Sequence, residues 1–345
     1  MYDLIVVGAG PVGSHLAREF AGRGRTVLLL ERGEVGKPVQ GTGHVSRDIF
    51  EHVPKDEGFV EKDIHGAEVH NRFGSYSFGR NEHTSYVIDR EGFDRFLLRR
   101  AKKAGVDFKR EAFVDFRATK GKVTVETNKD TYETRLLAGC DGPLSDVRVA
   151  AEIEKPGLFL HGIFTKQIEV GPIKQDYVEV FLDASKDFFG WKVPREESFE
   201  YGLAVELGGD SRKALERFAE KEGFHITDIH SGLIPILPPE KVTRGRVFLC
   251  GDAAGQVKPF SGGGLVYGLT SAEIAAETVD PEDATTLNRY EEMWRKELMD
   301  EIRFGNRIRK VYKLPFFLRA PLLWTGVRMS KNAHMDRPSS LINSG

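Results

Sequence analysis

Gly8-Ala9-Gly10-Pro11-Val12-Gly13 follows the apolar run Leu4-Ile5-Val6-Val7 and precedes a stretch of helix-forming residues. In this pattern Gly8 permits a tight turn, Gly10 lets the backbone approach a pyrophosphate, and Gly13 lets the helix pack on the strand. The N-terminus of that helix presents N–H groups and the positive end of its dipole to phosphates. The pattern therefore predicts a strand, a turn and a helix that hold a dinucleotide.

A second apolar run, Val27-Leu28-Leu29-Leu30, ends at Glu31. An acid at the end of this second strand can accept hydrogen bonds from the ribose hydroxyls of adenosine. The glycine motif alone is weak evidence, because many such matches are only turns. The strand before it, the strand after it and the acid in register together favour nucleotide binding.

Another glycine-rich stretch lies far along the chain. The apolar run 246–250 leads into Gly251 and Asp252, and Gly262, Gly263, Gly264 and Leu265 follow. An Asp at the end of a strand can bind a ribitol hydroxyl, and a helix opened by glycines can approach the flavin O2 and stabilise negative charge on the reduced ring. NAD domains need no such second site, so FAD is the expected cofactor. The plainer interpretation is a strand and a helix with a capping Asp.

Leu136-Leu137-Ala138-Gly139-Cys140 forms a third apolar run, which ends in Asp141-Gly142. The three motifs, in this order, resemble the flavoprotein family that includes aromatic hydroxylases, flavin halogenases and geranylgeranyl reductases. The resemblance implies an α/β fold, with a Rossmann-like parallel FAD-binding sheet, an inserted antiparallel substrate sheet and C-terminal helices. It also implies that Arg90 reaches the FAD phosphates and that the backbone of Val114 contacts the adenine.

Two further segments are similar to one branch of this family. Residues 36–46 resemble the segment after the second strand of archaeal geranylgeranyl reductases, which implies that Gly41, Thr42 and Gly43 lie against the flavin. Phe189-Gly190-Trp191-Lys192-Val193-Pro194 resembles their Tyr-x-Trp-x-Phe-Pro substrate motif, with Phe and Val at two aromatic positions. Phe189, Trp191 and Pro194 are therefore expected to line an apolar substrate tunnel, the alternative being ordinary core. Halogenases carry Trp where this chain has Ser14, so halogenation is not favoured.

Gly41 departs from the pattern of the group, whose members often carry Cys there. A thiol beside the flavin is a candidate for substrate handling or proton delivery, and that role does not transfer to Gly41. His44 is the replacement candidate for a catalytic proton source, because its ordinary pKa of about 6.5 permits both protonation states near neutrality. A packed or surface His without a chemical role is the alternative.

The resemblance implies an FAD-dependent reductase that saturates carbon–carbon double bonds in geranylgeranyl chains of an archaeal-type ether membrane lipid. FAD would carry the redox chemistry, and an external donor would reduce it; NADPH, a ferredoxin or another reduced carrier all remain open. Two alternatives remain open. One is a flavin-dependent monooxygenase, and the other is a redox-idle flavoprotein that binds lipid.

Composition excludes several other classes. The 345 residues carry a formal net charge of −2, which gives no general affinity for nucleic acid, and 40 % are hydrophobic, enough for a sizeable core. Cys140 and Cys250 each end an apolar run, so we expect buried packing rather than a disulfide or a metal site. The chain opens on a strand-forming run without the pattern of a signal peptide, which predicts a cytoplasmic protein.

The hydrophobic pattern predicts three parts and several individual elements. Helices are expected over 89–101, 211–222, 262–277 and 285–312, and a hairpin from 112–118 and 122–127. The parts are an FAD-binding domain from 1–60, 88–150 and 236–284, a substrate domain from 61–87 and 151–235, and a C-terminal helical region from 285–345.

Residues 303–331 contain eight basic side chains and no acidic one, interleaved with apolar stretches. Such a segment can lie on an anionic lipid surface, which predicts peripheral contact with the inner face of the cell membrane. Its apolar run is too short and too broken to span a bilayer. The alternative is a helical cap that packs on the substrate domain.

Overall fold

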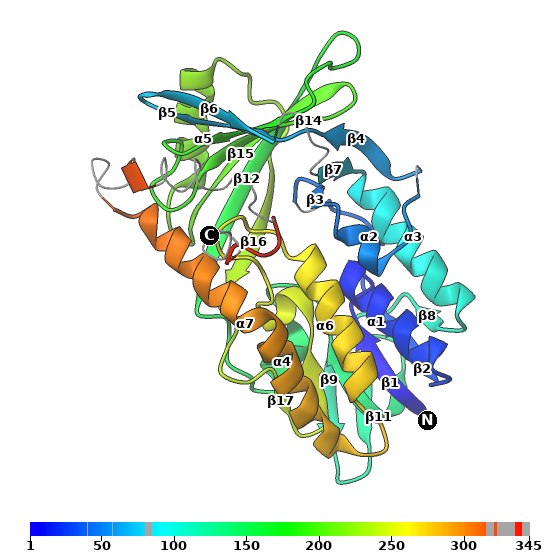
Figure 1. Cartoon of the computed structure of the whole chain (residues 1–345). Coiled ribbons are helices and arrows are strands. Elements are labelled where there is room, and N and C mark those ends of the chain that lie inside the picture. The colour runs from blue at the N-terminus through cyan, green and yellow to red at the C-terminus, as the bar shows by residue number, and fades with distance from the viewer. Residues whose placement is uncertain (40, 57, 80–84, 315–320, 323–334, 340–345) are drawn as a thin grey trace.

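The computed structural model describes residues 1–39, 41–56, 58–79, 85–314, 321–322 and 335–339 (Figure 1). A largely parallel sheet forms the lower half in that view and a seven-stranded sheet the upper half. The parallel sheet has the order β17-β18-β11-β1-β2-β8, and β9 and β10 extend it as an antiparallel hairpin from β11. Its strands are β1 (Tyr2–Val7), β2 (Val27–Leu30), β8 (Asp107–Lys109), β9 (Phe113–Ala118), β10 (Val123–Thr127), β11 (Thr131–Gly139), β17 (Thr243–Arg244) and β18 (Val247–Leu249).

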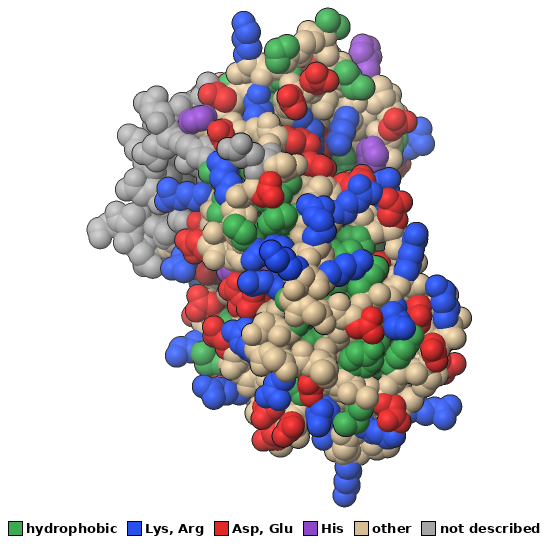
Figure 2. Space-filling model, turned by 90° about the vertical axis from the view of Figure 1, so that its right-hand side faces the viewer, with side chains coloured by type: hydrophobic (Ala, Val, Ile, Leu, Met, Phe, Trp, Pro, Cys, Tyr) green, Lys and Arg blue, Asp and Glu red, His purple; other side chains and the backbone are tan. Residues whose placement is uncertain are grey.

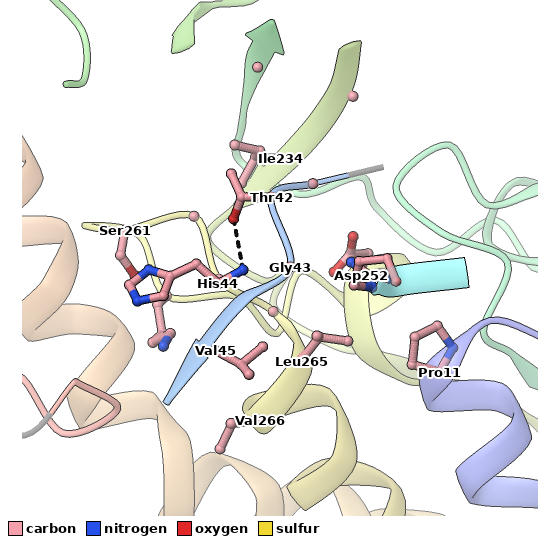
Figure 3. A pocket seen from close by; sticks show the side chains of 18 of the residues that line it. Pro11, Thr42, Gly43, His44, Val45, Ile234, Asp252, Ser261, Leu265 and Val266 are labelled. Carbon is pink, nitrogen blue, oxygen red and sulfur yellow. Dashed lines mark hydrogen bonds between the residues drawn. The ribbon is translucent and has the colours of Figure 1, made fainter. Parts of the chain in front are cut away.

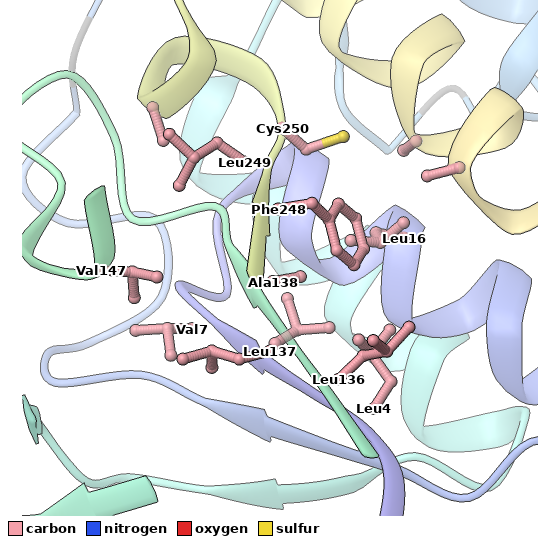
Figure 4. Close-up of a cluster of buried hydrophobic side chains, with 14 of the residues drawn as sticks. Leu4, Val7, Leu16, Leu136, Leu137, Ala138, Val147, Phe248, Leu249 and Cys250 are labelled. Atoms are coloured by element: carbon pink, nitrogen blue, oxygen red, sulfur yellow. The ribbon is translucent and has the colours of Figure 1, made fainter. Parts of the chain in front are cut away.

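Consecutive apolar residues build the central strands because both faces of this sheet are covered. Every residue of β2 and nearly all of β1 are buried. Helices α1 (Pro11–Gly22), α6 (Leu265–Thr278) and α7 (Leu287–Val311) supply much of the cover on one side (Figure 1). Figure 4 shows the resulting core, in which Leu4, Leu16 and Phe248 come from different elements and meet in one cluster.

The seven-stranded sheet has the order β16-β12-β15-β14-β13-β5-β6, and all its pairs are antiparallel except β13 with β5. Helix α5 (Ser211–Glu222) packs on it. Its strands are β5 (Ala67–Asn71), β6 (Gly74–Phe78), β12 (Leu158–Ile168), β13 (Val178–Phe181), β14 (Gly190–Pro194), β15 (Ser198–Glu206) and β16 (His230–Ile236). A smaller sheet of β3 (His44–Ser46), β7 (Ser85–Ile88) and β4 (Val60–Ile64) lies beside α3 (Arg90–Lys103) and α2 (Ile49–His52). The remaining elements are α4 (Asp146–Ala150), η1 (Gly251–Ala254) and η2 (Ala284–Thr286).

The elements expected from the pattern are confirmed within a few residues. Helix α5 spans the expected residues because Asp210 accepts a hydrogen bond from the Lys213 N–H at its start and Gly223 ends it with φ +75°. Helix α6 begins only at Leu265, because Gly262 adopts φ +74° and keeps the three glycines outside the helix. Of the expected C-terminal helical region, α7 is described, and residues 315–320, 323–334 and 340–345 lie outside the described residues.

Both cysteines are free thiols. Cys250 is buried as expected, and its Sγ is 3.2 Å from the Tyr290 hydroxyl. Cys140 corrects the expectation, because it is only half-buried and faces a cavity described below. On the face seen in Figure 2, acidic and basic side chains are interspersed, in keeping with the small net charge. No helix in the described part of the chain combines the length and apolarity needed to cross a membrane.

Candidate functional site

A cavity of about 1180 Å³ lies between the two large sheets. On one side it is lined at the carboxyl ends of the parallel strands, by Val7, Leu30, Cys140 and Cys250. Ligands of open α/β sheets bind at this edge. On the other side its walls come from the seven-stranded sheet, and Figure 3 shows part of the lining around His44 and Asp252.

The glycine turn after β1 is built as the sequence predicts. Gly8 has φ +99°, and a Cβ there would lie 2.4 Å from the Cys140 carbonyl oxygen. A Cβ on Gly13 would lie 1.8 Å from the Gly8 carbonyl oxygen, so α1 packs directly on the turn and Gly13 does not line the cavity. Gly10 does line it, and a Cβ there would meet nothing within 4 Å. The helix starts without a side-chain cap, which leaves its first N–H groups for an anion.

Val12 and Glu31 complete this end of the cavity. Val12 packs against Gly251 and Gly268, and a Cβ on Gly268 would lie 2.5 Å from Val12 Cγ2. The Glu31 carboxylate accepts the Ala9 N–H at 2.9 Å with one oxygen and the Gly33 N–H at 2.8 Å with the other. Each oxygen keeps a second acceptor position, so the held carboxylate can also accept ribose hydroxyls.

Asp252 lies in η1 and faces the cavity. Its carbonyl accepts the Gly255 N–H at 3.0 Å, whereas its carboxylate has no hydrogen-bond donor among the described residues. Burial raises the pKa of this carboxyl to about 6 while Arg90 opposes the shift. Arg90 lines the cavity at the start of α3, with Nη2 3.5 Å from Asp94 Oδ1. A Cβ on Gly264 would lie 2.7 Å from Asp252 Oδ1, so glycine is required there while this carboxylate keeps its place.

Gly262, Gly263, Gly264 and Leu265 line the cavity where α6 begins, again without a side-chain cap. A Cβ on Gly263 would lie 2.8 Å from Lys258 Cε. Next to these glycines, the buried Ser261 Oγ has no hydrogen-bond partner among the described residues, and the same holds for Asp141 Oδ1. Two orphaned polar atoms, one open carboxylate and two uncapped helix N-termini around one cavity fit the hydroxyls and phosphates of FAD.

Gly41, Thr42, Gly43 and His44 also line the cavity. The His44 N–H donates to Thr42 Oγ1 at 3.1 Å, drawn as the dashed line in Figure 3, and its Nε2 lies 2.8 Å from Ser85 Oγ. Burial, with a further effect from the Lys258 charge, lowers the pKa of His44 to about 4. The imidazole is therefore neutral near pH 7, and the ordinary pKa assumed from sequence was wrong. Its role as a proton source stays a prediction.

The upper wall of the cavity is apolar. Phe189 and Trp191 line it as expected, with Phe188 stacked on Phe189 at 4.2 Å between ring centroids and Tyr312 close by. Pro194 is buried but does not line the cavity. Side chains alternate along a strand, and Trp191 and Val193 share the face of β14 that lines the cavity. Val193 thus stands where Pro194 was expected.

Val114 lies on β9 beside the cavity, whose lining includes Glu111, Ala112 and Phe113 at the start of this strand. Its side chain is 54 % exposed and does not line the cavity. The expected contact of its backbone to adenine stays a prediction.

Lys258, which lies between Gly251 and Gly262 in the sequence, also lines the cavity and was not identified from sequence. Its Nζ is 2.5 Å from Asp336 Oδ1, and both side chains are only 4 % exposed. The Tyr267 hydroxyl donates to the Asp336 carbonyl at 2.9 Å, and Met335 and Pro338 also line the cavity. A lysine inside a glycine-rich, apolar stretch was the available signal, but its partner could not be found from spacing.

The basic segment 303–331 is described only in part. In its described portion, Arg309 pairs with Glu206 at 3.3 Å and Lys313 with the same carboxylate, while Ile308, Val311 and Tyr312 line the cavity. These contacts favour the helical-cap alternative for residues 303–314. The rest of the segment, except 321–322, lies outside the described residues.

Comparison with known proteins identifies related FAD-binding proteins. The family model described as FAD binding domain matches residues 1–232. The chain is 30 % identical over 349 residues to digeranylgeranylglycerophospholipid reductase 2 of Methanothermobacter thermautotrophicus, covering 90 % of this chain and 87 % of that protein. It is 30 % identical over 332 residues to digeranylgeranylglycerophospholipid reductase 1 of Methanococcoides burtonii, covering 87 % of this chain and 81 % of that one.

A solved structure supports the architecture. The geranylgeranyl bacteriochlorophyll reductase-like protein of Thermoplasma acidophilum has a TM-score of 0.85 at 19 % identity, over 99 % of this chain and 95 % of that one. This similarity confirms the expected α/β fold with its FAD-binding sheet.

Proposed function

Because this chain belongs to the geranylgeranyl reductase family of FAD-binding flavoproteins and is an FAD-dependent oxidoreductase, we propose that it saturates carbon–carbon double bonds in geranylgeranyl chains of an ether membrane lipid. The parallel sheet would be the FAD-binding domain and the seven-stranded sheet the substrate domain. The named relatives supply the substrate class, and the geometry of the cavity supplies the support from this chain.

One observation carries the proposal: a single cavity joins a polar end that fits FAD to an apolar wall of Phe188, Phe189 and Trp191. An isoprenoid chain offers no polar group to hold, so its binding depends on apolar burial worth about 25 cal/mol per Å². A wall of aromatic side chains beside the flavin end meets that need.

The polar end would hold FAD with the residues described above. The α1 N-terminus at Gly10 would face the pyrophosphate, Glu31 would accept from the adenosine ribose, and Asp252 would accept from the ribitol. The α6 N-terminus behind Gly264 places its positive dipole end at the cavity, where it favours negative charge. When bound, FAD supplies the hydride-transfer chemistry, and the protein contributes binding, orientation and electrostatics.

His44 remains the proposed proton source. With a pKa of about 4 it is neutral near pH 7, so it would act as an acid only when negative charge in the cavity raises that pKa. His44→Gln should therefore slow proton delivery most at low pH, where the wild-type imidazole can be protonated, and have little effect at high pH, while leaving FAD affinity within about twofold.

The electrons would come from an external donor, either NADPH or a ferredoxin. Of the basic segment 303–331, residues 303–314 pack as a cap through Arg309 and Lys313, so we keep the proposal of peripheral contact with the membrane for residues 315–331. The functional test needs neither partner.

The test is anaerobic. The purified protein is reduced with dithionite, a geranylgeranyl ether lipid is added, and flavin reoxidation is followed together with the mass of the lipid. Reoxidation coupled to a gain of one H₂ per double bond is the expected result. A flavin that stays reduced until air enters would overturn the proposal, and an oxygenated product would then identify a monooxygenase.

A further inference from the structure

A buried guanidinium connects the apolar wall of the cavity to the loop at its polar end. Arg195 follows β14 directly and is 6 % exposed. Its Nη1 lies 2.5 Å from Glu61 Oε2, and its Nη2 donates to the Thr42 carbonyl at 2.6 Å. The same Nη2 lies 3.3 Å from Glu200 Oε2. One side chain thus joins β4, β15 and the loop before β3.

The second oxygen of Glu200 extends this chain of contacts to the substrate wall. Glu200 is fully buried on β15, and its Oε1 accepts the Trp191 indole N–H at 3.3 Å. The Trp191 ring also lies against Gly202, where a Cβ would come within 2.4 Å of Cζ2. The indole of Trp191 is therefore fixed by its close contact with Gly202 and by the hydrogen bond from its N–H to the Glu200 carboxylate.

At the other end, the network reaches the loop of residues 41–43. This loop has little freedom, because Gly43 has φ +71° and a Cβ there would lie 2.3 Å from the Ile88 carbonyl oxygen. The Thr42 carbonyl accepts from Arg195, and the Thr42 hydroxyl accepts from the His44 N–H at 3.1 Å. A displacement at Trp191 can thus be transmitted through Glu200 and Arg195 to the residues expected beside the flavin.

The charges in this network are poorly suited to stability alone. Burial raises the pKa of Glu200, and the charge of Arg195 opposes this shift. For Arg195, burial disfavours the charged form, but the carboxylates of Glu200 and Glu61 raise its pKa. Replacing a buried ion pair by apolar side chains of similar volume is often neutral or stabilising. The fork of a guanidinium, by contrast, fixes the direction of several hydrogen bonds at once.

We propose that Arg195 is a positioning residue that couples substrate contact at Trp191 to the conformation of the loop 41–43. The inference rests on the proposed function, because it takes Trp191 as a wall that the isoprenoid chain touches. It assigns no chemical step to Arg195, which acts through Thr42 and Glu200.

The test combines Trp191→Phe, which keeps an aromatic side chain but removes the indole N–H and the part of the ring that lies against Gly202, with Arg195→Met and Arg195→Lys. Arg212→Met is the matched control, because Arg212 is exposed on α5 and pairs only with Glu216 within the described residues. The first readout is the visible absorption spectrum of the FAD-loaded protein without lipid. The second is the geranylgeranyl ether lipid concentration that gives half of the lipid-induced spectral change.

Without lipid, Trp191→Phe should alter the flavin spectrum in the wild-type background and not in the Arg195→Met background. With lipid, each substitution should raise the half-saturating concentration about tenfold, as expected for a hydrogen bond to a charged group, and the double variant should be no weaker than either one. Arg195→Lys should keep part of the response, and Arg212→Met all of it.

Independent effects of the two substitutions, on the lipid-free spectrum or on the half-saturating concentration, would overturn the coupling. The coupling would also be overturned if Arg195→Met lowered the thermal stability but Trp191→Phe still altered the flavin spectrum in the Arg195→Met background. That result would describe a purely structural arginine. If the wild type does not respond to lipid at all, the proposed function fails. The lipid-free comparison still decides the role of Arg195 in that case.

Discussion

Gly10→Ala is expected to separate FAD binding from folding. Gly10 has φ −67° and ψ −175°, which alanine adopts freely, and a Cβ there meets nothing within 4 Å. Replacing Gly by Ala at a compatible backbone stabilises by about 0.4–1 kcal/mol through the unfolded chain. Alanine is a poorer N-cap than glycine, which offsets part of that gain. The free energy of unfolding of the apoprotein should therefore change by less than about 1 kcal/mol.

The same methyl group should weaken FAD binding strongly. Gly10 lines the cavity at the uncapped start of α1, where we expect the pyrophosphate of FAD to bind. A methyl group at that place holds the phosphate away from the N–H groups, and each lost charge-assisted hydrogen bond costs about 1.5–3 kcal/mol. The dissociation constant for FAD should rise by about tenfold to a hundredfold.

Gly13→Ala is the matched comparison, because it adds the same group one helical turn further on. Its Cβ would lie 1.8 Å from the Gly8 carbonyl oxygen, whereas real Cβ atoms essentially never approach below 3.0 Å. Helix α1 must move off the turn, and overpacking of this kind costs about 1–3 kcal/mol or more. This variant should lose stability and FAD affinity together.

Denaturant unfolding of the flavin-free proteins, followed by FAD titration monitored through flavin fluorescence, measures both quantities. Wild-type FAD affinity in Gly10→Ala would refute the placement of the pyrophosphate. An apoprotein of Gly10→Ala as unstable as that of Gly13→Ala would refute the reasoning on the open space at Gly10.

Three further outcomes follow from other residues. Glu31→Ala and Asp252→Ala should each purify with less bound flavin, and full flavin occupancy in both would contradict the assigned site. Asp336→Ala leaves the Lys258 ammonium buried without its carboxylate and should destabilise by about 3 kcal/mol, the low end for a broken buried pair because the cavity admits water. Adding Lys258→Met should recover most of that loss in denaturant unfolding, and no recovery would show that the pair is not the cause. Glu273 is buried in part, which opposes ionisation, but hydrogen bonds with His15 and His52 lower its pKa from 4.5 to about 2. Its stabilising contribution is present above pH 4.5 and is lost as the pH falls toward 2. Glu273→Gln should therefore make the free energy of unfolding less dependent on pH in that window. An unchanged pH dependence would contradict this reasoning.

Much of the FAD-binding half could be read from local sequence. The glycines around α1 and α6, the apolar runs of β1 and β2, and the caps of α5 act through nearest neighbours, so their spacing reports their geometry. Asp252 and Glu31 were found for the same reason, since Glu31 directly follows β2 and Asp252 lies in η1 just after β18, and both strands end at the cavity.

Orientation around the cavity needed the folded chain. Pro194 was expected to line the cavity and Val193 lines it instead, because the face that a strand presents depends on its pairing partners and not on its own motif. The pKa of His44 was misjudged because it depends on burial and on the charge of Lys258, which is brought close only by folding.

The sequence by itself determined the family, the cofactor and the strand–turn–helix units that hold it, because these depend on short stretches whose residues meet within a few positions. Only the tertiary structure decided how Trp191, Glu200, Arg195 and Thr42 form one chain of contacts and how Asp336 reaches Lys258. Such contacts join residues far apart in sequence, and their energies arise from burial that no single segment creates.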